Sequence, residues 1–359
     1  MRRWDGEAGG TGPQVSRRDL LLSALVALLG GPRAASAAGG GLHPAGARTA
    51  QALLPVRVLT LNHVSFGCAD LASTVAWYER VLGIPRHAHQ DYLGGGRGQT
   101  VLRASVDPPA YMALSPRGPQ PASGPPTRRP HFCWGIADFD VHRILGALAE
   151  MRAPAESVLR EGTTINGVNF DGPDGAPLQF NPVIACGGVG FLGEVCDTSA
   201  RAVRRPGDLP PVQVRTMNHI KYHVSDLPSA LAWYLRLTDM EIVHYQEPEG
   251  GPRTAGYDGP PIPVLRVGTG PQHIALVEGS GPEAFRLHVG FGVDDFEPDG
   301  VMDTLRAHGV TAQVRMREGA TPEVLVDAPD GVRLQLQDVR YCGGGGPLGD
   351  VCRVPSGPS

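Results

Sequence analysis

Four histidines occupy matched places in the sequence, and imidazole is well suited to bind a transition metal or to exchange a proton near neutral pH. His63, His131, His219 and His288 each open an apolar run, and an aspartate follows each of them seven residues later. A single histidine at the start of an apolar strand is more often a core residue than a ligand. Four at matched positions favour a shared chemical role, although a duplication also copies residues that have no function.

Two further side chains next to His219 indicate acid–base chemistry in the second half of the chain. In a β-strand, residues i, i+2 and i+4 lie on one face, so Lys221 and His223 share a face with His219. The first half has Ser65 and Gly67 at the corresponding positions. We expect His223 to accept or donate a proton and Lys221 to hold an anionic oxygen. The alternative is that both residues lie at a solvated end of the strand.

The N-terminal segment has the pattern of an export signal. Paired arginines in the sequence SRRDLL precede an apolar stretch over residues 20–29, and a small-residue cleavage pattern, ASA, ends at Ala37. This pattern predicts a twin-arginine (Tat) signal peptide over 1–37, followed by a flexible segment over 38–55. A Sec signal with an accidental arginine pair is the alternative. The apolar stretch is too short to span a bilayer, so we expect Tat export to the bacterial periplasm or medium and no stable membrane span.

The six cysteines fit an oxidising compartment. Cys186 and Cys196 enclose a glycine-rich segment, and Cys342 and Cys352 enclose a second one at the same spacing. This repetition predicts two short loops, each closed by a disulfide. A metal site built on each cysteine pair is the alternative, but neither segment contains a histidine or a further cysteine. The two remaining cysteines lie in apolar strands and are expected to be buried: Cys68 and Cys133.

Composition limits the range of partners. The chain has 359 residues, of which 41% are hydrophobic, and its formal net charge is −4. No run of lysine and arginine marks a nucleic-acid-binding face, so we expect no nucleic-acid partner.

The chain repeats itself. LNHVSFGCADLASTVAWYERVLGI, from Leu61, corresponds to MNHIKYHVSDLPSALAWYLRLTDM, from Met217, and GPDGAPLQF corresponds to APDGVRLQL. The repeat predicts a first domain over 56–197, a linker over 198–211, a second domain over 212–353 and a tail over 354–359.

A smaller unit recurs inside each domain. Each of the four histidines opens a predicted strand, and a helical pattern follows in which Asp70, Asp226 and Asp295 are expected to be N-caps. Short apolar runs come next, such as 100–104, 110–114, 264–267 and 273–277, and an Asp-Gly turn precedes the last strand of each domain. The unit is therefore a βαβββ module that is used four times, and the fold class is α+β.

These motifs resemble the vicinal-oxygen-chelate superfamily, which includes glyoxalases, bleomycin resistance proteins and extradiol dioxygenases. The resemblance rests on strands that begin Asn-His, helices that contain Ala-Trp-Tyr and the Asp-Gly turns, and it covers nearly all of the chain after the signal. It implies tandem glyoxalase-like domains, in each of which two paired βαβββ modules form an open curved sheet with a cleft. A shared fold does not specify the chemistry.

The resemblance also implies that metal ligands come from the first and last strands of each module. Ala113 and Ala275 occupy one such position in each domain and cannot bind a metal. Three candidate ligands remain in each domain: His63, His131 and Gln179 in the first, and His219, His288 and Gln335 in the second.

The order of these ligands is similar to that of extradiol dioxygenases, in which two histidines and a glutamate hold ferrous iron and leave positions open for substrate and oxygen. Gln179 and Gln335 stand where that pattern has glutamate, and a neutral amide binds iron more weakly. The expected cofactor is a divalent metal ion, Fe(II) first, with Mn, Zn or Ni as alternatives. A metal-free cleft lined by polar groups is the competing interpretation.

The resemblance therefore implies a metal-dependent enzyme, most simply an extradiol-like dioxygenase that acts on a small aromatic compound. A glyoxalase-like lyase or isomerase is one alternative, and a non-catalytic binding protein of the bleomycin-resistance type is another. Lys221 and His223 favour the second domain as the catalytic one. Because two such domains lie in one chain, either a monomer or a homodimer is expected.

Overall fold

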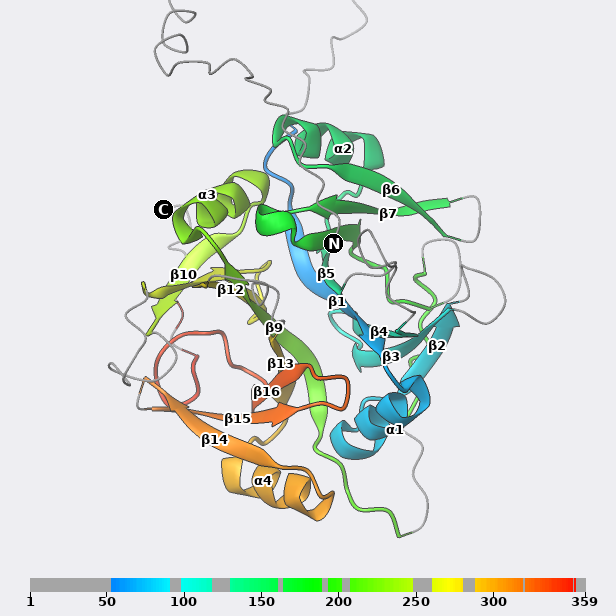
Figure 1. The fold of residues 1–359 in the computed structure, drawn as a ribbon, viewed down its shortest axis with the longest axis vertical. Coiled ribbons are helices and arrows are strands. Elements are labelled where there is room, and N and C mark those ends of the chain that lie inside the picture. Colours follow the sequence, from blue (N-terminus) through cyan, green and yellow to red (C-terminus); the bar gives the residue numbers. More distant parts are fainter. Residues whose placement is uncertain are drawn as a thin grey trace, which may run out of the picture. The chain divides into compact units, whose positions relative to one another are not determined.

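The computed structural model describes residues 53–90, 98–117, 130–160, 164–188, 193–201, 207–247, 260–279, 288–318, 320–350 and 352. Residues 52–359 belong to one compact unit (Figure 1). The predicted signal peptide over 1–37 and the tail over 354–359 lie outside the described residues. So does the predicted flexible segment over 38–55, except for its last three residues.

The first half of this unit contains the βαβββ pattern twice. Its eight strands form one sheet in the order β2-β3-β4-β1-β5-β8-β7-β6, and a short 3₁₀ turn over Pro173–Gly175 precedes the last strand. The elements are β1 (Val58–Cys68), α1 (Leu71–Leu82), β2 (Arg86–Gln90), β3 (Gln99–Ser105), β4 (Ala110–Pro116), β5 (His131–Ile136), α2 (Val141–Glu150), β6 (Ala155–Arg160), β7 (Thr164–Asp171) and β8 (Pro177–Pro182).

The second half repeats this arrangement. Its sheet has the order β10-β11-β12-β9-β13-β16-β15-β14, which is the order of the first sheet strand for strand. The predicted α+β class and the four βαβββ modules are therefore confirmed. The elements are β9 (Val214–Val224), α3 (Leu227–Leu237), β10 (Glu241–Gln246), β11 (Ile262–Arg266), β12 (His273–Glu278), β13 (His288–Val293), α4 (Pro298–Ala307), β14 (Ala312–Arg317), β15 (Thr321–Asp327) and β16 (Arg333–Asp338).

The sheet order places the first and last strands of the modules side by side. In the first sheet β1 pairs in parallel with β4 and antiparallel with β5, and β5 pairs in parallel with β8. His63 lies opposite Cys133, and Cys133 lies opposite Gln179. Strand pairing thus brings residues far apart in the sequence into one row at the centre of each sheet.

The prediction for the helix N-caps is partly confirmed. The side chains of Asp70 and Asp226 each accept a hydrogen bond from the backbone N–H three residues later, at 3.0 Å. The prediction for Asp295 is wrong. Asp295 has a φ of 47° in the turn before α4, whose N-cap is Glu297, and that side chain makes no capping bond. In the first domain Asp140 caps the corresponding helix α2.

The two sheets share one hydrophobic core. Buried residues of both domains belong to a single cluster, and Trp134 of the first domain packs edge-on against Tyr234 of α3 at 5.9 Å between ring centroids. Polar contacts also cross between the domains, since Tyr78 of α1 donates to Asp330 and the backbone N–H of Ser225 donates to Asp174. Asp174 and Asp330 are the aspartates of the two Asp-Gly turns. Each domain therefore contacts the other through its own Asp-Gly turn.

Cysteine placement follows the predictions. Disulfides join Cys186 to Cys196 and Cys342 to Cys352, whereas Cys68 and Cys133 are buried and belong to neither bridge. In the part of the chain that the structure describes, no helix has the length and hydropathy needed to cross a bilayer.

Candidate metal centre

The three candidate ligands of the first domain converge at the centre of its sheet. His63 on β1, His131 on β5 and Gln179 on β8 are held there by the strand pairing described above. The Nε2 atoms of His63 and His131 lie 3.3 Å apart, and Nε2 of His131 lies 3.2 Å from Oε1 of Gln179. The atoms through which these three side chains could bind a metal therefore lie close together, with Nε2 of His131 at the centre.

The neighbouring Asn62 fixes which nitrogen of His63 faces this point. The Asn62 amide nitrogen donates to the carbonyl oxygen of Ala185 at 2.5 Å, and a carbonyl oxygen can only accept. The amide oxygen of Asn62 must then face Nδ1 of His63, 3.0 Å away. This hydrogen bond assigns a proton to Nδ1 and directs Nε2 of His63 toward His131.

This arrangement fits a divalent metal ion. With metal–nitrogen bonds of about 2.0–2.1 Å, ligand atoms at adjacent positions are separated by about 3.0 Å in octahedral and about 3.4 Å in tetrahedral geometry. The two separations of 3.2 and 3.3 Å lie inside this range. The donor set of two neutral imidazoles and one amide oxygen suits Fe(II), Mn(II), Zn(II) or Ni(II) and leaves coordination positions for other ligands.

The second domain repeats the histidine pair. Asn218 donates to the carbonyl oxygen of Tyr341 at 2.6 Å and accepts from Nδ1 of His219 at 3.0 Å, so His219 has the same tautomer as His63. The rings of His219 and His288 lie 5.3 Å apart between centroids. Burial, then the neighbouring His273, His288, Lys221 and Arg317, hold the pKa of His219 well below its ordinary range, so the ring is neutral at pH 7.

Gln335 differs from its counterpart in the first domain. Its Oε1 accepts a hydrogen bond from the Arg315 guanidinium at 3.4 Å. Among the described residues its Nε2 has no hydrogen-bond partner, although the side chain is buried. The second domain therefore brings two histidines together, while the oxygen of the third candidate ligand is engaged by a cation.

A charged cluster, consisting of the buried Glu323 and Arg317 and the half-buried Arg315, lies beside Gln335. Glu323 on β15 is fully buried and accepts from Arg317 at 2.6 Å, from Arg315 and from the Tyr341 hydroxyl at 3.1 Å. None of these three residues was among the predicted site residues. The signal for this cluster was present, because a glutamate inside the apolar strand TPEVLVD and two alternating arginines in AQVRMR need partners if they are buried.

The side chains predicted to do acid–base chemistry lie at different distances from the histidine pair. Lys221 is buried and pairs in register with His288, and its ammonium group donates to Gln246 at 3.4 Å. The equivalent residue in the first domain is Ser65, which accepts a hydrogen bond from Gln99 at 3.1 Å. His223 is half-buried near the end of β9, four residues beyond His219 and so about 13 Å along the strand. The structure therefore brings Lys221, but not His223, next to the histidines.

The charged cluster gives the domain a predicted sensitivity to acid. Burial raises the pKa of Glu323, but Arg317 and Arg315 outweigh it and lower the pKa from 4.5 to about 2. A carboxyl group with a depressed pKa contributes stability above its unfolded-state pKa, and this stability is lost as the pH falls from about 4.5 to about 2. In urea unfolding experiments we expect the free energy of unfolding to fall across this window, and to fall less for Glu323→Gln. Parallel pH profiles for the two proteins would contradict this assignment.

Comparison with known proteins identifies the family to which the two domains belong. Residues 60–180 and 216–336 each match the family model of the Glyoxalase/Bleomycin resistance protein/Dioxygenase superfamily. No curated protein sequence matches the chain significantly.

Solved structures match the fold at low sequence identity. The 2,3-dioxygenase LapB from Pseudomonas sp. KL28 is 14% identical with a TM-score of 0.56, and the match covers 83% of this chain and 94% of that one. A catechol 2,3-dioxygenase is 14% identical with a TM-score of 0.52 (78% and 88% covered). The Mn(II)-bound glyoxalase from Novosphingobium aromaticivorans is 14% identical with a TM-score of 0.53 (79% and 83% covered). At this identity the likeness concerns the fold alone.

Proposed function

The chain belongs to the glyoxalase/bleomycin resistance protein/dioxygenase superfamily, and on that premise we propose that it is a divalent-metal-dependent enzyme that acts on a small molecule. The observation that carries the proposal is the convergence of His63, His131 and Gln179, whose donor atoms lie 3.2–3.3 Å apart. Fe(II) is the first candidate for the ion, with Mn(II), Zn(II) and Ni(II) as alternatives. The favoured reaction is extradiol-like ring cleavage of a small aromatic compound.

The residues around each centre would have distinct tasks. A bound divalent ion would act as a Lewis acid for adjacent oxygen atoms of a substrate. Asn62 and Asn218 hold the first histidine of each site in the tautomer that a metal needs. Lys221 is placed to stabilise an anionic oxygen beside His219 and His288, where the first domain has only the hydroxyl of Ser65.

The two domains then support different parts of the proposal. The first domain offers the stronger metal centre, because all three of its donors converge. The second domain, with His219, His288 and Gln335 as ligands, offers Lys221 and more distantly His223 for proton transfer or charge stabilisation. We propose that at least the first domain binds a metal ion. We also propose that charged side chains of the second domain contact the substrate.

A non-catalytic binding protein of the bleomycin-resistance type is the second candidate function. It is favoured by the neutral amides of Gln179 and Gln335, which hold iron less tightly than a carboxylate, and by the hydrogen bond from Arg315 to Gln335. A glyoxalase-like lyase or isomerase would use the same ligands as the dioxygenase and differs only in the reaction that it catalyses.

One set of assays separates these functions. Protein stripped with a chelator is reloaded with each of the four metals, and oxygen uptake is followed with catechols. We expect uptake only in the Fe(II)- or Mn(II)-loaded protein, and its loss in a variant that combines His63→Ala with His219→Ala. Metal retention with isomerisation of a hemithioacetal but no oxygen uptake would favour the lyase or isomerase. Ligand-induced thermal stabilisation that is insensitive to chelator, with no turnover, would favour the binding protein.

We also propose that the chain is exported through the twin-arginine pathway to the periplasm or beyond. The two disulfides support an oxidising location. Fusion of residues 1–37 to a reporter should direct it out of the cytoplasm, and replacement of Arg17 and Arg18 by lysine should stop this. Continued export of the lysine variant would favour the Sec alternative.

A further inference from the structure

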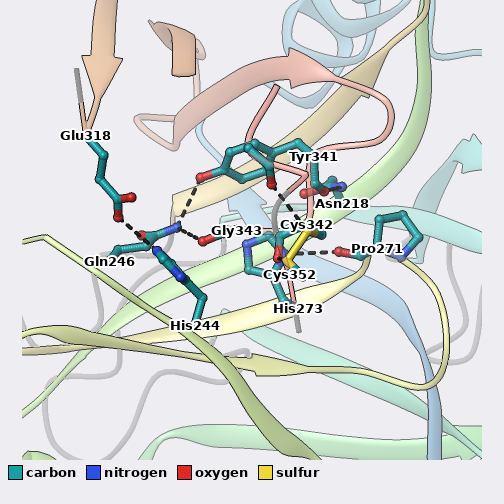
Figure 2. Close-up of a disulfide and its surroundings, with 11 residues drawn as sticks. Asn218, His244, Gln246, Pro271, His273, Glu318, Tyr341, Cys342, Gly343 and Cys352 are labelled. Carbon is teal, nitrogen blue, oxygen red and sulfur yellow. Dashed lines mark hydrogen bonds and ion pairs between the residues drawn. A yellow bond between two sulfur atoms is a disulfide. The ribbon is translucent and has the colours of Figure 1, made fainter. Parts of the chain in front are cut away.

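Each disulfide loop is connected to a site histidine through an asparagine. The carbonyl directly before the first cysteine of the loop binds the asparagine, and the asparagine orients the histidine. The carbonyl of Ala185, directly before Cys186, accepts the hydrogen bond of Asn62, and Asn62 orients His63. In the second domain the carbonyl of Tyr341, directly before Cys342, accepts from Asn218 (Figure 2). Asn218 in turn orients His219. The same three-part chain of cysteine loop, asparagine and histidine therefore occurs twice.

A second hydrogen bond links each loop to its sheet through the carbonyl of the residue that follows the first cysteine. Gln90 donates to the carbonyl of Gly187 at 2.9 Å, and Gln246 donates to that of Gly343 at 3.1 Å. Gln90, Gln246 and both glycines are buried. The start of each loop is thus bound on both sides of the cysteine to the sheet that carries the histidine.

The glycine of each loop also packs on a ring that stacks on the site histidine. Gly187 has a φ of 73°, and a Cβ built on it would lie 2.9 Å from the ring of Tyr111, which stacks on His63 at 4.5 Å between centroids. Gly343 has a φ of 82°, and its Cβ would lie 2.8 Å from His273, which stacks on His219 at 4.6 Å. A side chain at either glycine would push the stacked ring toward the histidine.

The disulfide holds this loop closed. In the first loop the backbone N–H groups of Cys186 and Gly188 both donate to the carbonyl of Gly193, and in the second the same two contacts run to Gly349. The bridges, with Cα atoms 5.9 and 6.3 Å apart, link these turns to the far end of each loop. Opening a bridge would let the start of the loop, and with it the asparagine's acceptor carbonyl, move away from the histidine.

We propose that the two disulfide loops are positioning devices for His63 and His219, and that opening them weakens metal binding. Asn62 and Asn218 are the positioning residues through which the loops act. The effect on metal binding rests on the function proposed above, whereas the effect on the histidine tautomer does not. Opening requires a dithiol reductant, which is oxidised to its disulfide as it supplies two electrons and two protons to each bridge.

The test measures the histidines and the metal separately. Long-range proton–nitrogen correlation spectra of the metal-free, ¹⁵N-histidine-labelled protein report the tautomer of His63 and His219, with His→Ala variants for assignment. Zn(II) titration then reports affinity. We expect the Nδ1–H tautomer in the oxidised protein and mixed tautomers after dithiol treatment. In protein whose cysteine pairs are replaced by serine, which leaves no thiolate in either loop to bind zinc, Zn(II) affinity should fall by about 10–100-fold, the usual effect of losing a hydrogen bond to a ligand histidine.

Matched variants localise the effect. Cys186→Ser with Cys196→Ser should affect only His63, and Cys342→Ser with Cys352→Ser only His219. Asn62→Leu should reproduce the first change without opening a bridge and should leave the tautomer of His219 unchanged. Unchanged tautomers in the reduced wild-type protein, together with unchanged Zn(II) affinity in the two serine double variants, would overturn the proposal. Absence of Zn(II) binding by the oxidised protein would instead overturn the proposed function and leave the tautomer result to decide on the positioning role.

Discussion

Replacing His131 with alanine is expected to lower the affinity of the first domain for a divalent metal by more than about 100-fold, beyond the usual effect of losing an outer hydrogen bond to a ligand. The reason is its central place, since its Nε2 lies within 3.3 Å of both His63 and Gln179. Removing it leaves one imidazole and one neutral amide, which is too few donors for a stable centre. Isothermal titration with Mn(II) and Zn(II) measures the change.

The control for this substitution is His142→Ala. His142 lies on the exposed face of α2 in the same domain, so its loss should leave the affinity unchanged within about twofold. If the His131→Ala protein bound metal as tightly as the wild-type protein, the first domain would not be the metal site. His219 and His288 would then be the remaining histidine pair.

Replacing Glu323 with glutamine is expected to lower the free energy of unfolding by about 3 kcal/mol at pH 7, the lower end of the range for removing one partner of a buried ion pair. The carboxylate is fully buried and accepts from two guanidinium groups, those of Arg315 and Arg317. Glutamine keeps the size of the side chain but loses its charge. Urea denaturation followed by tryptophan fluorescence measures the difference.

The control for this second substitution is Glu297→Gln. Glu297 is an exposed glutamate of the same domain whose side chain makes no capping hydrogen bond, and we expect a change within about 0.5 kcal/mol. If Glu323→Gln were equally mild, the cluster would not stabilise the fold, and its charges would have to be explained by contacts with a ligand.

Most of the fold could be predicted because its signals are local and are repeated four times. The spacing of each histidine and aspartate marks a strand and the start of a helix, and the Asp-Gly turns mark the last strand of each domain. The error at Asp295 has a local cause. Asp295 lies two residues before the true N-cap, Glu297, and it belongs to the turn that precedes the helix, where its φ is positive. Side-chain chemistry alone does not reveal such an offset.

The details of the site could be predicted less well, because they depend on which side chains meet across strands. His63 lies opposite Cys133, whereas His219 lies opposite Gly290, where a Cβ would come within 2.0 Å of the imidazole. The engagement of Gln335 by Arg315 likewise needs the pairing of β14, β15 and β16. Two domains with matched ligand residues therefore have different environments, and the duplication in the sequence conceals that difference.

The role of Asn62 and Asn218 was also hidden in the sequence, although both stand directly before a candidate ligand. Neighbouring residues on a strand point to opposite faces, which argues against contact between their side chains. The structure nevertheless places each amide oxygen 3.0 Å from Nδ1 of the following histidine. The acceptor that orients each amide lies 123 residues away in the sequence, so no local pattern indicates it.

The most direct test of the metal centre is anomalous diffraction from crystals soaked in Mn(II) or Zn(II), recorded on both sides of the metal absorption edge. We predict an anomalous peak between Nε2 of His63, Nε2 of His131 and Oε1 of Gln179, at bonding distance from all three atoms. A saturating soak that gives no peak here or at the pair of His219 and His288, or gives peaks only at surface carboxylates, would contradict the assignment of this chain as a metal-dependent enzyme.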